Sequence, residues 1–289
     1  GYYVSGFIFK KFDREEMYFV KKYTEWENVR IPSSCIGFFE NPFEGSTGIK
    51  HLSVPNSVKS LIKYNFANIT SLESIALPNT IKVIPEGAFN GCVLLKNVKM
   101  NGRINYIRER IKIGKRAFAN CESLQVMELP VGLRKIEEGV FSGCKNLENI
   151  ILNDDLVEIG NQAFMGCTAL SSIPLPSTIQ KIGFQAFEDC LNLENVYGLE
   201  NTGIETLPNE IFQGCIRLKN VQFPTGLKSI GAHAFYDCKH IEEISIFRTD
   251  VEYIGVAAFQ NCYMLSEMVL PRKIRIIEKF MFKSCTQLR

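Results

Sequence analysis

Apolar residues recur along this chain at fixed steps from a phenylalanine. Relative to that phenylalanine, apolar residues stand at −8 and −5, a small residue at −1, cysteine at +3, leucine at +6 and an aliphatic residue at +9. The phenylalanine and the cysteine occur together as Phe89 and Cys92, Phe118 and Cys121, Phe141 and Cys144, Phe164 and Cys167, Phe187 and Cys190, Phe212 and Cys215, Phe235 and Cys238, Phe259 and Cys262, and Phe282 and Cys285. Successive cysteines of this series are 29, 23, 23, 23, 25, 23, 24 and 23 residues apart. A period of this length indicates one structural unit per segment, each stacked on the next, and therefore predicts a solenoid.

The slots of the repeat predict its local structure. The stretch from +6 to +11, such as residues 147–152, alternates between inward and outward positions as a short strand does. Because every unit runs in the same direction, strands of neighbouring units can pair only in parallel. A proline eleven residues before the phenylalanine often follows the strand and ends it, because proline has no N–H to donate. This slot holds Pro32, Pro55, Pro78, Pro130, Pro176, Pro224 and Pro271.

The second half of each unit predicts turns. Glycine frequently follows the −5 residue, as in Ile159-Gly160, and Pro85 or Pro208 takes its place elsewhere, so we expect a turn there. Residues 162–167 then predict one helical turn or a 3₁₀ piece that closes the unit.

The period extends towards the start of the chain with substitutions. Phe66 has Ile69 in the cysteine slot, and Phe43 has Ser46 there. We therefore divide the chain into about 11 repeats over residues 31–289, the last one incomplete, and a degenerate N-terminal cap over residues 1–30. The sequence stops where the strand after Leu288 should begin, so we expect more repeats or another domain to follow.

The pattern Leu-Pro-x-x-Leu-x-x-Ile-x-x-x-x-Phe-x-x-Cys-x-x-Leu-x-x-Ile, almost whole in residues 129–150, resembles the leucine-rich repeats of the BspA-like class. The resemblance covers residues 31–289. It implies an α/β solenoid shaped as a horseshoe, with a parallel β-sheet on the concave side and short helical or 3₁₀ turns on the convex side. It also implies a cell-surface or secreted protein that adheres to host matrix proteins, other microbes or polymers. The unit around residues 106–116 departs from the pattern, because it is six residues too long.

Composition excludes several classes of protein. Apolar residues make up 46% of the chain, which excludes a disordered protein. The formal net charge of +2 carries no signal for nucleic-acid binding. No apolar run approaches the roughly 18 residues that cross a bilayer, so we expect no membrane insertion of this segment.

Ten cysteines raise the question of redox or metal chemistry. Nine of them share one slot, where cysteine serves as a small buried apolar residue, and Cys35 occupies an apolar slot too. Stacked rungs lie at least about 4.8 Å apart, whereas a disulfide needs Cβ atoms at about 3.5–4.5 Å, so we expect unbridged thiols. No Cys-x-x-Cys pair occurs, and we expect no zinc or other cofactor.

The other candidate chemistry has a structural interpretation as well. The phenylalanine series fits a core spine better than an aromatic ligand box. His233 and His240 could form a two-histidine metal site, but we expect them to face solvent on the outer turn. No nucleophile with a local base, no phosphate loop and no paired-carboxylate motif appears, so the sequence predicts no catalytic residues and no enzyme.

The longest unit contains a basic stretch. Residues 99–116 hold seven basic residues and one acid, among them Lys99, Arg103 and Arg108. The stretch fits a solvated insertion. It also fits contact with an anionic partner, such as glycan sulfate or an acidic protein loop, and binding should then weaken with salt.

Outward positions at +8 and +10, followed from Ser74 and Ala76 onwards, define the concave face. The candidate partner-binding residues there, besides Lys99, are Asn97, Glu128, Asn149, Asn195, Tyr197, Asn220 and Gln222. Small polar groups suit a wet, adaptable binding surface and suit a merely solvated sheet face equally well.

The sequence thus predicts a non-enzymatic cell-surface module for adhesion or recognition. Its partner would be a protein, from the host matrix or a microbial surface, or a glycan. Two other functions stay open, a targeting domain of a larger surface enzyme and a spacer that projects another domain.

Overall fold

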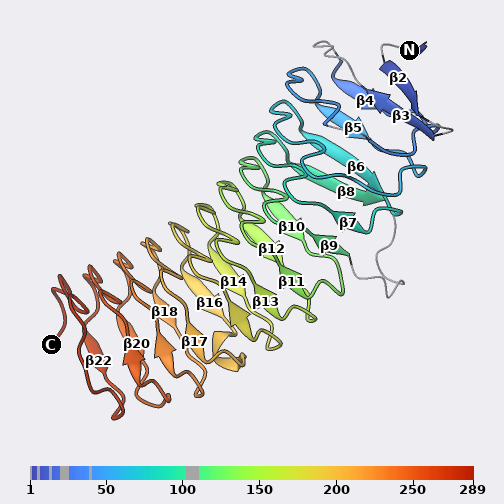
Figure 1. Ribbon diagram of the computed structural model, residues 1–289. Coiled ribbons are helices and arrows are strands. Elements are labelled where there is room, and N and C mark those ends of the chain that lie inside the picture. Colours follow the sequence, from blue (N-terminus) through green and yellow to red (C-terminus); the bar gives the residue numbers. More distant parts are fainter. Residues whose placement is uncertain (1, 5–6, 13–14, 20–25, 39–40, 102–110) are drawn as a thin grey trace.

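The protein is a stack of coils, one coil for each repeat (Figure 1). The computed structural model describes residues 2–4, 7–12, 15–19, 26–38, 41–101 and 111–289. Each coil contributes one strand to a row that we call row A, and the coils from β6 to β20 add a second short strand to row B. The turns that carry the phenylalanine follow in each coil. The predicted solenoid is confirmed.

Row A contains the strands predicted from the +6 to +11 slots. They are β4 (Asn28–Arg30), β5 (His51–Ser53), β6 (Ser74–Pro78), β8 (Asn97–Asn101), β10 (Val126–Glu128), β12 (Asn149–Ile151), β14 (Ser172–Pro174), β16 (Asn195–Tyr197), β18 (Asn220–Val221), β20 (Glu243–Ser245) and β22 (Glu267–Val269). The hydrogen-bonded groups are β4-β5-β6-β8, β10-β12, β14-β16-β18 and β20-β22, and every pair is parallel. Each pair joins equivalent slots, as Ile173 pairs with Val196.

The short strands of row B stand where the sequence predicts only a turn. They are β7 (Val83–Ile84), β9 (Lys112–Ile113), β11 (Lys135–Ile136), β13 (Glu158–Ile159), β15 (Lys181–Ile182), β17 (Thr206–Leu207), β19 (Ser229–Ile230) and β21 (Tyr253–Ile254). In β13, Ile159 is buried while Glu158 is partly exposed. Two residues are too few to show an alternating pattern in the sequence, and the ladder forms because the same pair recurs in the next coil.

Three further strands precede row A. β1 (Tyr2–Val4), β2 (Phe7–Phe12) and β3 (Glu15–Phe19) form an antiparallel sheet in the order β1-β2-β3. They lie at one end of the stack in Figure 1, within the segment for which the sequence predicts a cap.

The turns around each phenylalanine are not helical, which corrects the prediction of helical or 3₁₀ turns on the convex side. Among the described residues, the only 3₁₀ helix is η2 (Leu199–Asn201), and it lies elsewhere in its coil. The residues two before and two after the phenylalanine have positive φ, for example Gln162 at 54° and Gly166 at 72° around Phe164. A right-handed helix excludes such angles. Alternate N–H groups of the turn bond to the next coil, as Phe164 donates to the carbonyl of Ala186 at 2.9 Å. The N–H groups between them donate within the turn, as Met165 does to the carbonyl of Gln162 at 3.2 Å.

The stack is extended, with the two chain ends at opposite ends of the molecule (Figure 1), and the predicted horseshoe is not supported. Paired strands are spaced about 4.8 Å apart in row A. On the phenylalanine side, neighbouring rings from Phe66 to Phe282 have centroids 5.3 to 5.9 Å apart. In a horseshoe, neighbouring coils are much farther apart on the outer side than on the inner side, for example where helices about 10 Å across form the outer side. Because both sides of this coil rise by similar amounts, the stack bends little.

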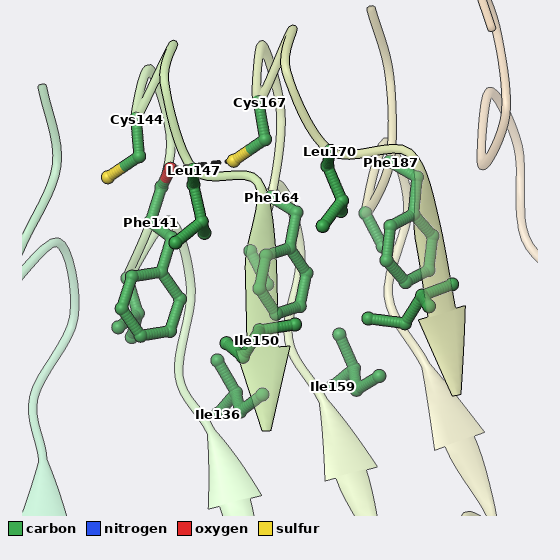
Figure 2. Close-up of a cluster of buried hydrophobic side chains, with 14 of the residues drawn as sticks. Ile136, Phe141, Cys144, Leu147, Ile150, Ile159, Phe164, Cys167, Leu170 and Phe187 are labelled. Carbon is green, nitrogen blue, oxygen red and sulfur yellow. Dashed lines mark hydrogen bonds between the residues drawn. The ribbon is translucent and has the colours of Figure 1, made fainter. Parts of the chain in front are cut away.

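The core is one continuous cluster of side chains inside the coils. Phe141, Phe164 and Phe187 stack in succession, with Ile150 and Ile159 beside them (Figure 2). The rings of Phe164 and Phe187 are 1° from parallel with centroids 5.5 Å apart. Each ring therefore covers the ring of the next coil, and no coil has a complete core without its neighbours.

The cysteine thiols bind the backbone of the preceding coil. Cys167 Sγ donates to the carbonyl of Phe141 at 3.2 Å, drawn as a dashed line in Figure 2. The equivalent bonds of the series, from Cys92 to Cys285, measure 3.0 to 3.3 Å. Each cysteine thus fills the core and also supplies a hydrogen bond between coils.

Candidate functional site

The outward side chains of row A form two parallel columns along the stack. The +8 column contains Asn97, Asn149, Asn195 and Asn220, and the +10 column contains Lys99, Glu128, Tyr197 and Gln222. All of them are exposed except Asn195, which is half-buried. Strand pairing places Asn195 beside Asn220. Arg103 and Arg108 lie outside the described residues.

The middle of row A exposes large apolar side chains on adjacent coils. We call Val126, Ile151, Pro174 and Tyr197 the central stripe. Ile151 is 53% exposed and Tyr197 is 57% exposed. Strand pairing places Tyr197 next to Pro174. The sequence predicts small polar groups on this face, but this part of it also exposes large apolar side chains. Each apolar residue of the central stripe has an asparagine or serine of the +8 column next to it.

The start of row A contains a shallow depression of about 270 Å³ over β4, β5, β6 and β8. We call it the basic tray. Its outward side chains are Asn28, Arg30, His51, Ser53, Ser74, Ala76 and Lys99. His51 Nδ1 and Ser74 Oγ are hydrogen-bonded at 2.8 Å. The lining holds an arginine, a lysine and a histidine but no acidic residue.

Ion pairs border the basic tray at the +7 slot of the same coils. Lys50 contacts Glu27 at 2.6 Å, and Lys96 contacts Glu73 at 3.0 Å. The hydrogen bond from Lys96 lowers the pKa of the Glu73 carboxyl below its usual value. Neither Arg30 nor Lys99 has an ion pair with another described residue. The positive charges of Arg30 and Lys99 in the tray are therefore not compensated by a described acidic residue, whereas each lysine at the border is paired with a glutamate.

Sequence reasoning missed Arg30, His51 and Ser53. The signal was present, since His51 and Ser53 stand at +8 and +10 from Phe43. The predicted outward positions began at Ser74 and Ala76, one coil later, because the unit around Phe43 follows the repeat pattern more loosely, with Ser46 in the cysteine slot.

The basic stretch of residues 99–116 is divided between faces of the coil. Lys99 lies on row A, whereas Lys112 and Lys115 line a second depression, of about 660 Å³, on row B. The two depressions share no lining residue. In the second one, Lys63 is paired with Glu86 at 2.7 Å, and Lys115 with Glu138 at 3.0 Å. Much of its positive charge is therefore already compensated.

The two histidines singled out in the sequence have separate neighbours. His240 Nδ1 contacts the carbonyl of Ile216 at 2.8 Å, and the ring of His233 lies edge-on to that of Tyr236. Among the residues that the structure describes, no three His, Cys, Asp or Glu side chains are grouped to hold a metal ion. Within the same residues, no helix has the length and hydrophobicity needed to cross a membrane.

Burial shields most of the cysteine thiols. All ten are free thiols, and nine of them are buried. Burial raises the pKa of the Cys144 thiol to about 12, above the ordinary 9.0. A thiol with so high a pKa is neither a nucleophile nor a metal ligand at neutral pH.

Solved structures of bacterial leucine-rich repeat proteins have a similar fold. A leucine-rich cell surface protein from Faecalibacterium prausnitzii superposes with a TM-score of 0.63 and 21% identity, over 100% of this chain and 93% of that chain. A leucine-rich repeat protein from Bacteroides ovatus superposes with a TM-score of 0.54 and 22% identity, over 100% of this chain and 93% of that one. No curated protein sequence matches the chain significantly.

A family model describes the repeat. The model of the BspA type leucine rich repeat region, with six copies, matches residues 16–111, 109–204 and 199–289. These matches extend over the row A strands from β4 to β22. The repeat pattern, the parallel stack and this match lead to one conclusion: the chain belongs to the family of the BspA type leucine rich repeat region.

Proposed function

We propose that this protein is a non-enzymatic recognition module of the bacterial cell surface, or a secreted one, that binds a protein partner across row A. The observation that carries the proposal is the central stripe, in which Val126, Ile151, Pro174 and Tyr197 are exposed on adjacent coils. The family and the likeness to a cell surface protein support the location.

The composition of the central stripe suits a protein interface. Tyrosine is enriched among the residues that contribute most to binding, and it buries a large area with only two side-chain torsions to immobilise. Tyr197 has Pro174 beside it, which offers a flat apolar platform, and Asn195 and Asn220 lie in the next column for hydrogen bonds. An interface with an apolar centre and a polar rim has this arrangement.

The stack also supplies rigidity. Backbone hydrogen bonds join the coils through row A, row B and the phenylalanine turns. A surface whose backbone is fixed before binding loses little conformational entropy on association, which increases affinity. A spacer would need the same rigidity but not an exposed tyrosine and isoleucine on one face, so the central stripe favours recognition.

The test is binding of the purified chain to a panel of purified extracellular matrix proteins and bacterial surface proteins, measured by biolayer interferometry. For a partner found in this way, Tyr197→Ala should weaken binding by about tenfold or more, as truncation of a central aromatic residue does. Tyr253→Ala is the matched control, because Tyr253 is 50% exposed but lies in β21 of row B.

Two results would refute the proposal. One is that no member of the panel binds, which would favour the spacer. The other is that Tyr253→Ala and Tyr197→Ala weaken binding equally, since row A would then have no special role. A targeting domain of a larger surface enzyme would bind in the same way, so binding supports that function equally.

A further inference from the structure

We propose that the basic tray is a second binding site, specific for an acidic oligosaccharide that carries sulfate or carboxylate groups. The site is independent of the central stripe, because it lies over β4 to β8 and shares no residue with it. The proposal rests on the charge, the shape and the chemistry of the tray.

The charges of the tray are placed at its two ends. Arg30, Ser53, Ala76 and Lys99 are paired in succession across the four strands, so Arg30 and Lys99 are three rungs apart. Three rungs correspond to about 14 Å. At this backbone separation, a single small anion would be contacted by both cations only if both side chains leaned toward each other along the stack. A chain of several sugar units with repeated anionic groups can contact both.

The floor between the two cations is low and polar. The middle rungs carry Ser53, Ser74 and Ala76, which are small, and the inward side chains of Leu52 and Ile75 are buried beneath them. Hydroxyl groups and the His51 imidazole line the floor, and they can donate hydrogen bonds to sugar hydroxyls and accept hydrogen bonds from them. Small side chains between larger ones also leave room for a ring to lie flat on the sheet.

The same chemistry argues against an acidic peptide as the occupant. Protein partners are held chiefly by apolar or aromatic side chains that enter apolar pockets. The outward lining of the basic tray has no apolar side chain larger than Ala76, and the exposed apolar residues of row A begin only at Val126, in β10. The tray offers charge and hydrogen bonds alone, as a hydrated acidic glycan requires.

Arg30 and Lys99 are available for such a ligand. No ion pair joins either of them to another described residue, whereas Lys50 and Lys96 at the border are paired with Glu27 and Glu73. An arginine can bind a sulfate or carboxylate through two parallel N–H bonds, and the lysine acts as a second point of charge. Removal of both cations should therefore abolish most of the attraction without breaking an interaction of the fold.

The experiment measures binding of a heparin octasaccharide to the whole chain by isothermal titration calorimetry. The double variant Arg30→Ala with Lys99→Ala should lose about tenfold or more in affinity at low salt, because each charge-assisted contact is stronger than a neutral one. Raising the salt from about 50 mM to about 200 mM should weaken binding to the unaltered chain. Thermal unfolding of the variant should match that of the parent.

The matched control is Lys112→Ala with Arg134→Ala. It removes the same net charge from the larger depression on row B, so affinity should stay within about twofold if the site is on row A. The proposal is overturned if this control weakens binding as much as the tray variant does, or if the octasaccharide does not bind at low salt.

Two further probes test the class of ligand. A chemically desulfated octasaccharide of the same length should bind much more weakly, because it retains fewer anionic groups. A decaglutamate peptide should also bind weakly. If the peptide binds as tightly as heparin and its binding is lost in the Arg30→Ala, Lys99→Ala variant, the tray recognises charge alone, and the assignment to a glycan is wrong.

Tyr197→Ala tests whether the two sites are separate. It should leave heparin binding unchanged, so a failure of this proposal can be distinguished from a failure of the proposed protein interface.

Discussion

At the scale of single residues, the cysteine of each repeat is explained by its hydrogen bond. The carbonyl of each phenylalanine accepts the N–H of the cysteine in its own coil and the thiol of the cysteine in the next coil, as Phe141 does from Cys144 and Cys167. A buried polar group without a partner is costly, so both lone pairs of this carbonyl are used. An aliphatic residue in the slot, such as Ile69, keeps the packing but donates no such bond.

Burial of the thiols predicts their chemical reactivity. In the folded chain at pH 8, iodoacetamide should label Cys285 first, because it is only partly buried, while burial raises the pKa of the Cys92 and Cys144 thiols to about 12. Peptide mass spectrometry after timed labelling measures the order. The control is the same reaction in urea, where all ten cysteines should react. Native labelling of Cys144 at the rate of Cys285 would contradict the burial.

The same shifts predict loss of stability in alkali. The pKa of the Cys144 thiol is raised in the folded state above the ordinary 9.0, so its contribution to stability is complete below about pH 9 and is lost as the pH rises towards 12. The free energy of unfolding should fall by about 1.4 kcal/mol per pH unit for each such thiol. Urea unfolding from pH 8 to pH 10.5 measures this. Cys144→Ala should show a shallower dependence on pH, and an unchanged dependence would count against the thiols as its source.

Glycine before the turn is required by the approach of the preceding coil. An added Cβ at Gly160 would lie 2.8 Å from backbone atoms of Glu137 and Glu138. Gly160→Ala should therefore destabilise the protein by about 1–3 kcal/mol, as overpacking does. Gly226→Ala is the control, because nothing lies within 4 Å of its added Cβ. Urea denaturation of both variants measures the difference, and equal midpoints would mean that the coils can move apart at no cost.

At the scale of secondary-structure elements, opposite charges meet on three neighbouring strands of row B. Glu158 in β13 lies between Lys135 in β11 and Lys181 in β15, with each N···O distance 3.5 Å. Each such surface pair contributes little alone. In these three coils, the stacking nevertheless places each lysine next to the glutamate, so the charges favour this order of strands.

A pair of charge reversals tests this ordering. Glu158→Lys would place three cations on adjacent strands and should destabilise the chain by about 0.5–1 kcal/mol. Glu243→Lys should have the opposite effect, because strand pairing places Glu243 beside Glu267 and the change removes a repulsion. Thermal unfolding at low and high salt measures both effects, and salt should reduce both. Shifts of the same sign would show that pairing across strands is not their cause.

At the scale of the whole molecule, stability spreads from coil to coil along one dimension. The hydrogen-bonded strands of rows A and B pair with strands of neighbouring coils, and the phenylalanine rings stack from coil to coil from Phe66 to Phe282. A change in one coil should therefore act on its two neighbours and fade beyond them.

Two phenylalanine truncations test the one-dimensional model. Phe187 is fully buried and stacks on Phe164 at 5.5 Å and on Phe212 at 5.6 Å, so Phe187→Ala should cost about 3–5 kcal/mol. Phe282 is partly buried and stacks on Phe259 alone, so Phe282→Ala should cost clearly less. Hydrogen exchange by mass spectrometry should show faster exchange in the coils next to residue 187. Uniformly faster exchange over all coils would mean that the stack unfolds as a single unit.

The sequence pattern predicted the features that depend on repeated burial of the same apolar slots. Repeated slots such as Phe164, Cys167 and Ile173 assigned the solenoid, the parallel row A and the core, because burial of an apolar residue recurs at the same place in every unit. The outward positions of row A were predicted in part, while their role in binding stays a prediction. Tyr197 and Lys99 are exposed on row A, but Arg30 and His51 were overlooked in units whose pattern had degenerated.

What stacking itself settles does not follow from the apolar pattern, although it recurs from coil to coil. The strands of row B, the positive φ of Gln162 and Gly166 and the extended shape all depend on hydrogen bonds between one coil and the next. Such bonds join residues about one repeat apart, and they reward backbone conformations that a single unit would not adopt. The hydrophobic order of the chain thus determines that coils form and which side chains they bury. The contacts between coils decide the curvature of the stack and which charges meet on its surface.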